Sequence, residues 1–348
     1  MNPILMIPLV FGLGLGTTIA FTSSHWLIAW MGLEISTIAI IPLMAKHHHP
    51  RAIEAATKYF LTQATGAALL LFATMINAWL SGEWDFYHTS NPIAIILVTL
   101  ALALKMGLAP LHAWLPEVLQ GVDLITGMVI STWQKLAPFA LLTQIDPSNS
   151  HLLTFLGLTS TLVGGWGGLN QTQLRKILAY SSIAHLGWVA LAMQFSKSLA
   201  LLTLLTYVVM AAAAFLVFDH TNSTDLTTLA MSATKNPVLT AFTPLILFSL
   251  GGLPPLTGFF PKWMILQVMV ENNCALMATI AALSSLLSLY VYLRIAYAMT
   301  LTMSPGTITS AIFWVLRLPR PSLHLATLTM ASTGLLPIAP VLITVLSI

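Results

Sequence analysis

The chain has 348 residues and a formal net charge of +3; 57% of its residues are hydrophobic and only 7% are charged. With a mean hydropathy of +0.88, this composition excludes a water-soluble protein, because the polar side chains are too few to cover a surface that faces water. No basic run is interleaved with aromatic residues, so we also exclude nucleic acid as a partner.

The sequence predicts an all-α, multi-pass membrane protein of about eleven transmembrane helices, because apolar runs of about 20 residues recur along it. The expected spans are 3–21, 24–44, 55–79, 92–118, 124–144, 152–169, 174–193, 199–218, 237–270, 275–299 and 323–346. We count the ninth, 237–253 with a continuation to Val270, as one broken span. A short helix at 307–316 is expected to lie at the membrane interface. The first span lacks a preceding charged region, so we expect it to be retained rather than cleaved as a signal peptide.

Loop charges predict the orientation of the chain. When the spans are threaded across the membrane, most basic loop residues fall on the side of the N-terminus. These residues are Lys46, Arg51, Arg175, Lys176, Lys235, Arg317 and Arg320. The other side carries Lys197, Glu83, Asp85, Asp146 and Glu271. We therefore expect the N-terminus on the inner side and the C-terminus on the outer side.

An internal repeat relates two parts of the chain. The run GLAPLHAWLPE at 107–117 matches GLPPLTGFFPK at 252–262 without a gap. Each copy lies in the fourth span of a five-span block, and a block with an odd number of spans is inverted when it repeats across a membrane. We therefore expect a first repeat at 1–145, an inverted second repeat at 151–300, and an interfacial helix with the final transmembrane helix at 301–348.

Both copies of the repeat contain residues that break helices. Proline has no N–H group, so Pro110 and Pro116 leave the carbonyls of Met106 and His112 without helical partners. The expected breaks are at Gly107, Pro110, Pro116, Gly252, Pro254, Pro255 and Pro261. A simple kink is the alternative. We favour a cavity, because a charged residue accompanies each break and freed carbonyls at membrane depth need water or protein partners.

Four ionisable residues of the predicted spans are candidates for a proton pathway: Glu34, Lys105, Lys135 and Lys262. An ionised group at the bilayer centre costs about 2.5–3.5 kcal/mol on insertion scales, which favours a functional explanation. A structural salt bridge is the alternative, but one glutamate cannot neutralise three lysines. Burial favours a neutral lysine and a nearby carboxylate favours a charged one, so a lysine whose carboxylate partner approaches and retreats is a proton-binding site.

Two histidines are weaker candidates for the same pathway. His112 lies within the first break, where an imidazole that titrates near neutral pH is placed to relay protons. His185 lies in the middle of the seventh span and is the weakest candidate. For both, a histidine that only packs and forms hydrogen bonds is the alternative.

The sequence gives no sign of a catalytic, cofactor or metal site. Cys274 is the only cysteine, which excludes an internal disulfide and an iron–sulfur cluster held by this chain alone, since such a cluster takes about four thiolates. The histidine run at 47–49 has no carboxylate or cysteine nearby to complete a metal site. The GLGLG run at 12–16 falls inside a predicted span, so it is not a dinucleotide-binding turn.

Long motifs carry a resemblance to a known family. They are SSHWLIAWMGLEISTIAIIPLM, HHHPRAIEAATKYFLTQA, LALKMGLAPLHAWLPEVLQG, ISTWQKLAP and LRKILAYSSIAHLGW. Over essentially the whole chain they look like the NADH dehydrogenase subunit 2 family of mitochondrial respiratory complex I in its vertebrate form. The resemblance implies a single antiporter-like domain that translocates protons in the membrane arm.

The resemblance also assigns roles to residues. Glu34, Lys105 and Lys135 match the family's functional positions, and Lys262 corresponds best to the ionisable residue of the second broken helix. Lys262 departs from the repeat, because it stands opposite Glu117 rather than Lys105.

The family further implies a setting in a larger complex. NADH, FMN, iron–sulfur clusters and ubiquinone are expected on other subunits, with no cofactor bound by this chain. The expected partners are the neighbouring antiporter-like subunits, the small membrane subunits near the quinone module, and membrane lipids. The expected location is the mitochondrial inner membrane, with the N-terminus in the matrix and the C-terminus in the intermembrane space.

We thus expect a proton-translocating core subunit of the NADH:ubiquinone reductase, coupled to quinone reduction elsewhere in the complex. One alternative is a standalone cation/proton antiporter, which usually needs an intramembrane aspartate pair or polar cation ligands. The other is a purely structural subunit, in which the buried charges only hold helices together.

Overall fold

The computed structural model describes residues 3–46, 48–86, 91–145, 150–234, 237–301, 323–338 and 340–341. Within these ranges the chain is built from helices, and extended pairing is limited to two isolated bridges, His25 with Asp85 and Gln173 with Asp225. Six of the described helices are long and apolar enough to cross a membrane, and two further apolar helices are shorter. The all-α membrane fold is confirmed, while the number of eleven spans stays a prediction.

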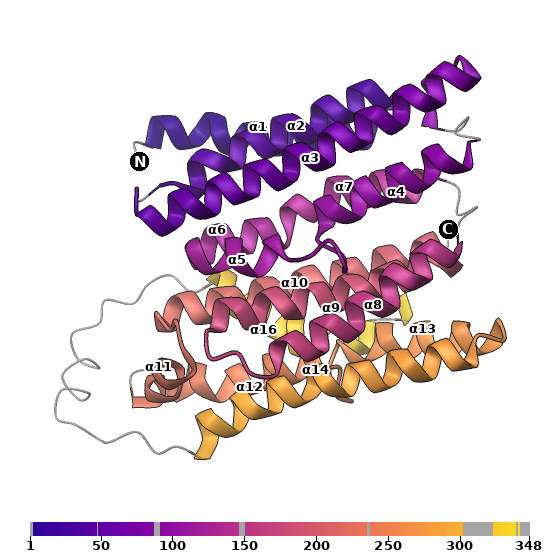
Figure 1. Cartoon of the computed structure of the whole chain (residues 1–348). Helices are drawn as coiled ribbons and strands as arrows, with labels where there is room; N and C mark the ends of the chain where they lie inside the picture. The colour runs from indigo at the N-terminus through magenta and orange to yellow at the C-terminus, as the bar shows by residue number, and fades with distance from the viewer. Residues whose placement is uncertain are drawn as a thin grey trace. The chain divides into compact units, whose positions relative to one another are not determined.

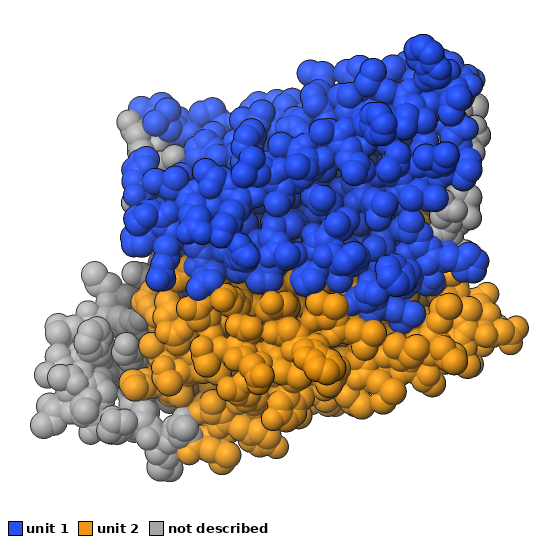
Figure 2. Space-filling view, viewed as in Figure 1, with its two compact units in different colours: residues 1–159 blue, residues 160–348 orange. Residues whose placement is uncertain are grey.

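The chain forms two compact units, residues 1–159 and 160–348 (Figure 2). Unit 1 contains α1 (Pro3–Thr22), α2 (Trp26–Met44), α3 (Pro50–Ser81), α4 (Pro92–Met106), α5 (Trp114–Gly121), α6 (Leu124–Ser131), the 3₁₀ helix η2 (Trp133–Lys135), α7 (Leu136–Gln144) and the start of α8 (Ser150–Gly168) (Figure 1). Unit 2 contains α9 (Leu174–Phe195), α10 (Lys197–Thr221), α11 (Leu226–Ala230), η3 (Met231–Thr234), α12 (Pro237–Gly251), α13 (Phe259–Glu271), α14 (Ala275–Leu301), α16 (Leu323–Gly334) and η4 (Leu336–Ile338).

Glycines let α1 and α2 approach closely in unit 1. A Cβ atom at Gly16 would lie 2.7 Å from both the Gly32 carbonyl oxygen and the Ser36 nitrogen. A Cβ atom at Gly32 would in turn lie 2.8 Å from the Gly16 carbonyl oxygen. Small residues at such contacts are typical of helix pairs in membranes. Gly16, the last residue of the GLGLG run at 12–16, therefore packs against the turn of α2 that carries Glu34.

The first predicted break follows α4. Gly107 adopts φ +82°, the left-handed conformation that glycine takes without strain. The Gly107 N–H donates to the Leu104 carbonyl at 3.2 Å and the Leu108 N–H donates to the Ala103 carbonyl at 3.0 Å. This pair of bonds is the Schellman arrangement that ends a helix. The chain then runs through turns, with a cis peptide bond before Pro110, until α5 begins.

The second copy of the repeat ends α12 in the same way. Gly252 also has φ +82°, and its N–H donates to the Ser249 carbonyl at 3.0 Å. The Leu253 N–H donates to the Phe248 carbonyl at 3.2 Å, and a cis peptide bond precedes Pro255. Each copy of the repeat therefore ends a helix with the same local hydrogen bonds.

Two of the prolines predicted to break helices lie in the first turn of a helix instead. Pro116 and Pro261 are the third residues of α5 and α13. In the first turn of a helix the backbone N–H groups have no helical partner, so a proline there costs no hydrogen bond. Pro116 and Pro261 are therefore compatible with the start of the next helix, and their role as helix-breaking residues stays a prediction.

The fifth predicted span, expected to be continuous over 124–144, is also interrupted. Its parts are α6, η2 and α7. At the end of α6 the Thr132 and Ser131 hydroxyls donate to the Met128 carbonyl at 2.6 and 3.0 Å, a type of bond that bends helices. Pro138 then offers no N–H to the Gln134 carbonyl, which removes a further α-helical bond. Lys135 consequently lies in a 3₁₀ turn rather than in an α-helix.

The structure describes only part of the C-terminal region, residues 301–348. The expected interfacial helix at 307–316 lies outside the described residues, as does the end of the final span beyond residue 341. The described part of that span is α16 followed by η4, and α16 packs against α10 and α12. The Thr257 hydroxyl, in the second break, donates to the Ser332 carbonyl near the end of α16.

Candidate functional site

Unit 1 brings Glu34 and Lys105 together. Glu34 lies in the middle of α2 and Lys105 in the last turn of α4. The Lys105 Nζ is 4.0 Å from the Glu34 Oε1, and the two side chains are 2% and 23% exposed. The Lys105 ammonium is buried and makes no hydrogen bond to the described residues. The ion pair is therefore loose, with a desolvated charge on the lysine side.

Two uncharged side chains donate hydrogen bonds to backbone carbonyls at the end of α4. The Trp114 indole Nε1–H donates to the Leu104 carbonyl at 3.1 Å, and the Gln63 Nε2–H donates to the Lys105 carbonyl at 3.4 Å. The Trp114 ring also packs edge-on against Tyr59, with ring centroids 5.7 Å apart. The broken end of α4 is thus held by side chains from α3 and α5, and the Lys105 ammonium takes no part in it.

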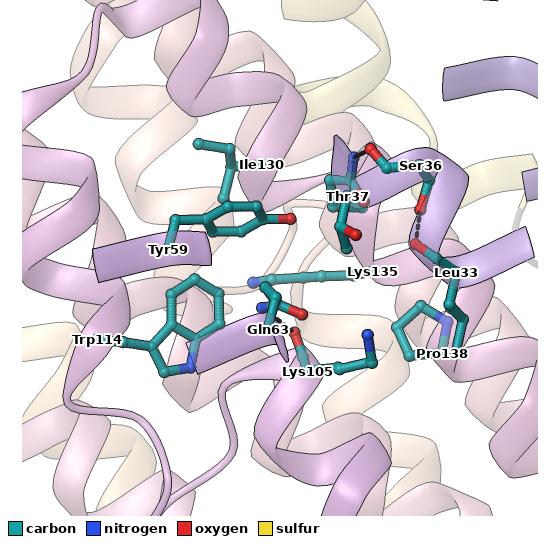
Figure 3. A pocket seen from close by; sticks show the side chains of 11 residues that line it. Leu33, Ser36, Thr37, Tyr59, Gln63, Lys105, Trp114, Ile130, Lys135 and Pro138 are labelled. Atoms are coloured by element: carbon teal, nitrogen blue, oxygen red, sulfur yellow. Dashed lines mark hydrogen bonds between the residues drawn. The ribbon is translucent and has the colours of Figure 1, made fainter. Parts of the chain in front are cut away.

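Lys105 and Lys135 line the same small cavity in unit 1 (Figure 3). Its other lining residues are Leu33, Ser36, Thr37, Tyr59, Gln63, Trp114, Ile130, Gln134 and Pro138. The cavity has a volume of about 10 Å³, which is close to the space that one water molecule needs. Its polar lining provides the several partners that a buried water requires.

Lys262 lies in a different environment, at the broken helix of unit 2. Its side chain is buried, and its Nζ donates to the Gly251 carbonyl at 2.8 Å and to the Leu250 carbonyl at 3.3 Å. Pro254 and Pro255 have no N–H groups that could bond these carbonyls. A positive charge at a helix C-terminus is also favoured by the helix dipole. Lys262 therefore caps α12, and it does not line the cavity of Lys105.

The two histidine candidates lie outside that cavity. His112 lies in the turns between α4 and α5, where it is half-buried. His185 is buried in α9, and its ring stacks on Tyr207 with centroids 5.3 Å apart. The environment of His185 supports the packing alternative.

Sequence reasoning missed the polar residues that surround the lysines. Tyr59 and Gln63 are spaced by four residues on α3, a spacing that places both on one face of a helix. Two polar groups on one face of an apolar helix were the available signal. Ser36 and Gln134 gave no comparable signal, because they are brought together only by the tertiary structure.

A second charged group in unit 1 is exposed. The Lys58 Nζ lies 2.7 Å from the Glu54 Oε1 and 2.8 Å from the Glu117 Oε2. The three side chains are between 42% and 61% exposed. Exposed ion pairs of this kind contribute about 0–1 kcal/mol to stability. Glu117, the repeat partner of Lys262, thus forms a peripheral link between α3 and α5.

No group of three or more histidine, cysteine, aspartate or glutamate side chains suited to a metal ion occurs among the residues described by the structure. The site around Lys105 presents lysine ammonium groups, one carboxylate and neutral hydrogen-bonding groups. These groups can bind, hold and pass protons.

The chain matches two family models that together cover most of its length. Residues 23–288 match "NADH:quinone oxidoreductase/Mrp antiporter, TM", and residues 289–343 match "NADH dehydrogenase subunit 2 C-terminus". Proteins named NADH-ubiquinone oxidoreductase chain 2 from Tetraodon nigroviridis and Gadus morhua are each 61% identical to it over 348 residues, which is 100% of both chains. The chain belongs to the NADH-ubiquinone oxidoreductase chain 2 family. The resemblance found in the sequence motifs is confirmed.

Solved structures show the same fold as this member of the chain 2 family. A chain of respiratory complex I from Thermus thermophilus is 28% identical, with a TM-score of 0.81 over 97% of this chain and 80% of that chain. The Mrp complex from Dietzia sp. contains a chain that is 16% identical, with a TM-score of 0.83 over 97% of this chain and 76% of that chain. At that level of identity the second match supports the fold alone.

Proposed function

We propose that this chain is a proton-translocating subunit in the membrane arm of respiratory complex I, and that it moves protons without redox chemistry of its own. Membership of the NADH-ubiquinone oxidoreductase chain 2 family supports the assignment to this complex. One observation carries the proton pathway: the buried ammonium of Lys105 faces Glu34 at 4.0 Å and shares a cavity with Lys135.

Lys105 is the proposed loading site. A buried ammonium is stabilised by a carboxylate at 4.0 Å, and loss of that partner leaves an uncompensated charge at high energy. When Glu34 retreats or becomes neutral, the Lys105 ammonium therefore releases its proton. One water molecule in the cavity would relay this proton to Lys135, which lines the same space and accepts the proton when its amine is neutral.

Lys262 is the proposed exit residue. Two backbone carbonyls hold its ammonium in place of a carboxylate. Proton release leaves an amine whose two N–H groups still reach these carbonyls, but without the charge that strengthens the bonds. His112 is retained as a candidate relay and His185 as the weakest candidate. The proposed division into a first repeat at 1–145, an inverted repeat at 151–300 and a C-terminal part at 301–348 stays a prediction.

The proposed setting is the mitochondrial inner membrane, with the N-terminus in the matrix and the C-terminus in the intermembrane space. Neighbouring antiporter-like subunits and the small membrane subunits near the quinone module are the proposed partners within the complex. NADH, FMN, iron–sulfur clusters and ubiquinone are assigned to other subunits. The energy for pumping would reach this chain from quinone reduction as a shift in charge or hydration near Glu34.

The test is the proton stoichiometry of the assembled complex in proteoliposomes. In the Lys105→Ala variant we expect NADH oxidation with fewer protons moved per NADH than in the wild type, at normal complex content. Lys197→Ala is the matched control, because Lys197 is an exposed lysine at the start of α10. Wild-type stoichiometry in Lys105→Ala would overturn the proposed function.

The same preparation separates the alternatives. A structural subunit predicts that Glu34→Gln and Lys135→Ala reduce complex assembly and leave the proton stoichiometry per complex unchanged. A standalone antiporter predicts cation or proton flux by the purified chain in vesicles without the rest of the complex. The proposed function predicts neither result.

A further inference from the structure

The turn that carries Lys135 has lost part of its own backbone support. Lys135 lies in the 3₁₀ helix η2, between α6 and α7. Pro138 has no N–H to bond the Gln134 carbonyl, and the Lys135 N–H reaches the Thr132 carbonyl at 3.3 Å, near the limit for a hydrogen bond. An interaction outside the turn is therefore needed to fix its position.

The side chain of Gln134 supplies such an interaction. Its Nε2–H donates to the Ser36 carbonyl on α2 at 3.0 Å, across 98 positions of the sequence. A carbonyl oxygen has two lone pairs, so the Ser36 carbonyl accepts this bond in addition to its own bond within the helix. Gln134 also lines the cavity that contains Lys105 and Lys135.

The Ser36 end of this bond is well anchored. Ser36 is buried at 1% exposure, and its backbone lies against α1 at Gly16, where even a Cβ atom would approach within 2.7 Å of the Ser36 nitrogen. Ser36 is also close in sequence to Glu34 on the same helix. A donor that binds the Ser36 carbonyl is therefore tied to the part of α2 that carries the carboxylate.

We propose that Gln134 is a positioning residue for proton transfer, and that its amide fixes the turn of Lys135 against the turn of α2 that carries Glu34. This inference rests on the proposed function, since it assumes that Lys105 and Lys135 exchange protons. Gln134 carries no charge and is not itself a proton carrier. Its bond to Ser36 holds the receiving lysine at a set place in the cavity that the donating lysine also lines.

Proton transfer is sensitive to this kind of positioning. A proton passes between heavy atoms about 2.6–3.2 Å apart, directly or through one water. The cavity has room for about one water molecule, so an added gap between the lysines is not bridged without an additional water. A displacement of about 1 Å at a reacting group lowers a rate on the order of a hundredfold.

Gln134→Met and Gln134→His test the proposal in the assembled complex. Methionine keeps the length of the side chain but has no donor, while the His Nε2–H reaches about as far as the glutamine amide. We expect Gln134→Met to lower the number of protons pumped per NADH as far as Lys105→Ala does, at normal complex content. We expect Gln134→His to restore most of it. Gln267→Met is the control, because the Gln267 amide bonds Glu271 on an exposed part of α13.

The outcomes separate this inference from the proposed function. Wild-type stoichiometry in Gln134→Met, with a loss in Lys105→Ala, overturns the positioning role and leaves the proposed function intact. Wild-type stoichiometry in Lys105→Ala overturns the proposed function itself. A lower content of assembled complex with unchanged pumping per complex assigns Gln134 a purely structural role and overturns the inference. Equal losses in the Met and His variants also overturn it, because the donor would then be irrelevant.

Discussion

The ammonium of Lys262 donates to the carbonyl of Gly251 at 2.8 Å, at the end of the broken helix α12. At the corresponding end of α4, Trp114 and Gln63 donate to the backbone carbonyls instead. The Lys105 ammonium lies opposite the carboxylate of Glu34. The two units thus use the same glycine-based helix end but give their lysines different partners. One lysine closes a helix, and the other forms a loose ion pair.

Lys262→Met should open the end of α12. Hydrogen bonds to charged groups are worth about 1.5–3 kcal/mol, so the loss of the ammonium should weaken the turns at 252–258. We expect amide hydrogen exchange in this segment, measured by mass spectrometry on the purified complex, to become about tenfold faster or more. Lys197→Met, at an exposed site, should leave this exchange unchanged. Equal exchange in both variants would show that Lys262 does not cap the helix.

Gly252→Ala should be more harmful than Gly82→Ala. Both glycines have positive φ, at +82° and +76°, so both substitutions cost about 1–2 kcal/mol of backbone strain. At Gly252 the added Cβ would also lie 2.9 Å from the Cδ of Lys262, whereas at Gly82 it meets no atom within 4 Å. We expect the thermal stability of the complex to fall further for Gly252→Ala. Equal losses would argue against a tight contact with Lys262.

Gly16→Ala should disturb the pairing of α1 with α2. The new methyl group would lie 2.7 Å from backbone atoms of α2, so the helices must separate, at a cost of about 1–3 kcal/mol. Gly14→Ala is the matched control in the same helix, because a Cβ there meets no atom within 4 Å. Thermal inactivation of the complex measures both. We expect a lower midpoint for Gly16→Ala and an unchanged or higher one for Gly14→Ala, and the reverse order would contradict the packing.

Trp114→Phe should loosen the end of α4 without removing its aromatic contact. Phenylalanine keeps a ring beside Tyr59 but lacks the N–H that bonds the Leu104 carbonyl. The loss of one hydrogen bond costs about 1 kcal/mol, so exchange of the amides at 107–113 should become severalfold faster. Trp79→Phe is the control, since Trp79 is 86% exposed. A similar effect of both substitutions would mean that the indole bond does not stabilise the break.

The broken helices could be predicted because their causes are local. Gly107 and Gly252 adopt the left-handed conformation that ends a helix, and the prolines that follow prevent its continuation. The positions of Glu34 and Lys105 could be predicted from the cost of burying charge in a membrane. The exact partners of Lys262 could not, because this lysine lies 11 and 12 positions beyond the carbonyls that it bonds and reaches them only when the second half-helix folds back on the first.

The break around Lys135 was missed for a different reason. Its determinants are the hydroxyl bonds of Ser131 and Thr132 together with Pro138, and each of these residues is tolerated singly in a membrane helix. The bond from Gln134 to Ser36 joins residues 98 positions apart, so no window of sequence contains both ends. Features that depend on tertiary contact remained outside the reach of sequence reasoning.

The size of the Lys105–Lys135 cavity has a consequence for membrane leakage. A continuous file of waters conducts protons passively, and such conduction would short-circuit any gradient that the membrane stores. A space of about 10 Å³ accommodates about one water molecule, so the cavity itself holds no such file. A proton that passes through the cavity is therefore handed on by the two lysines that line it, Lys105 and Lys135, rather than by a row of waters.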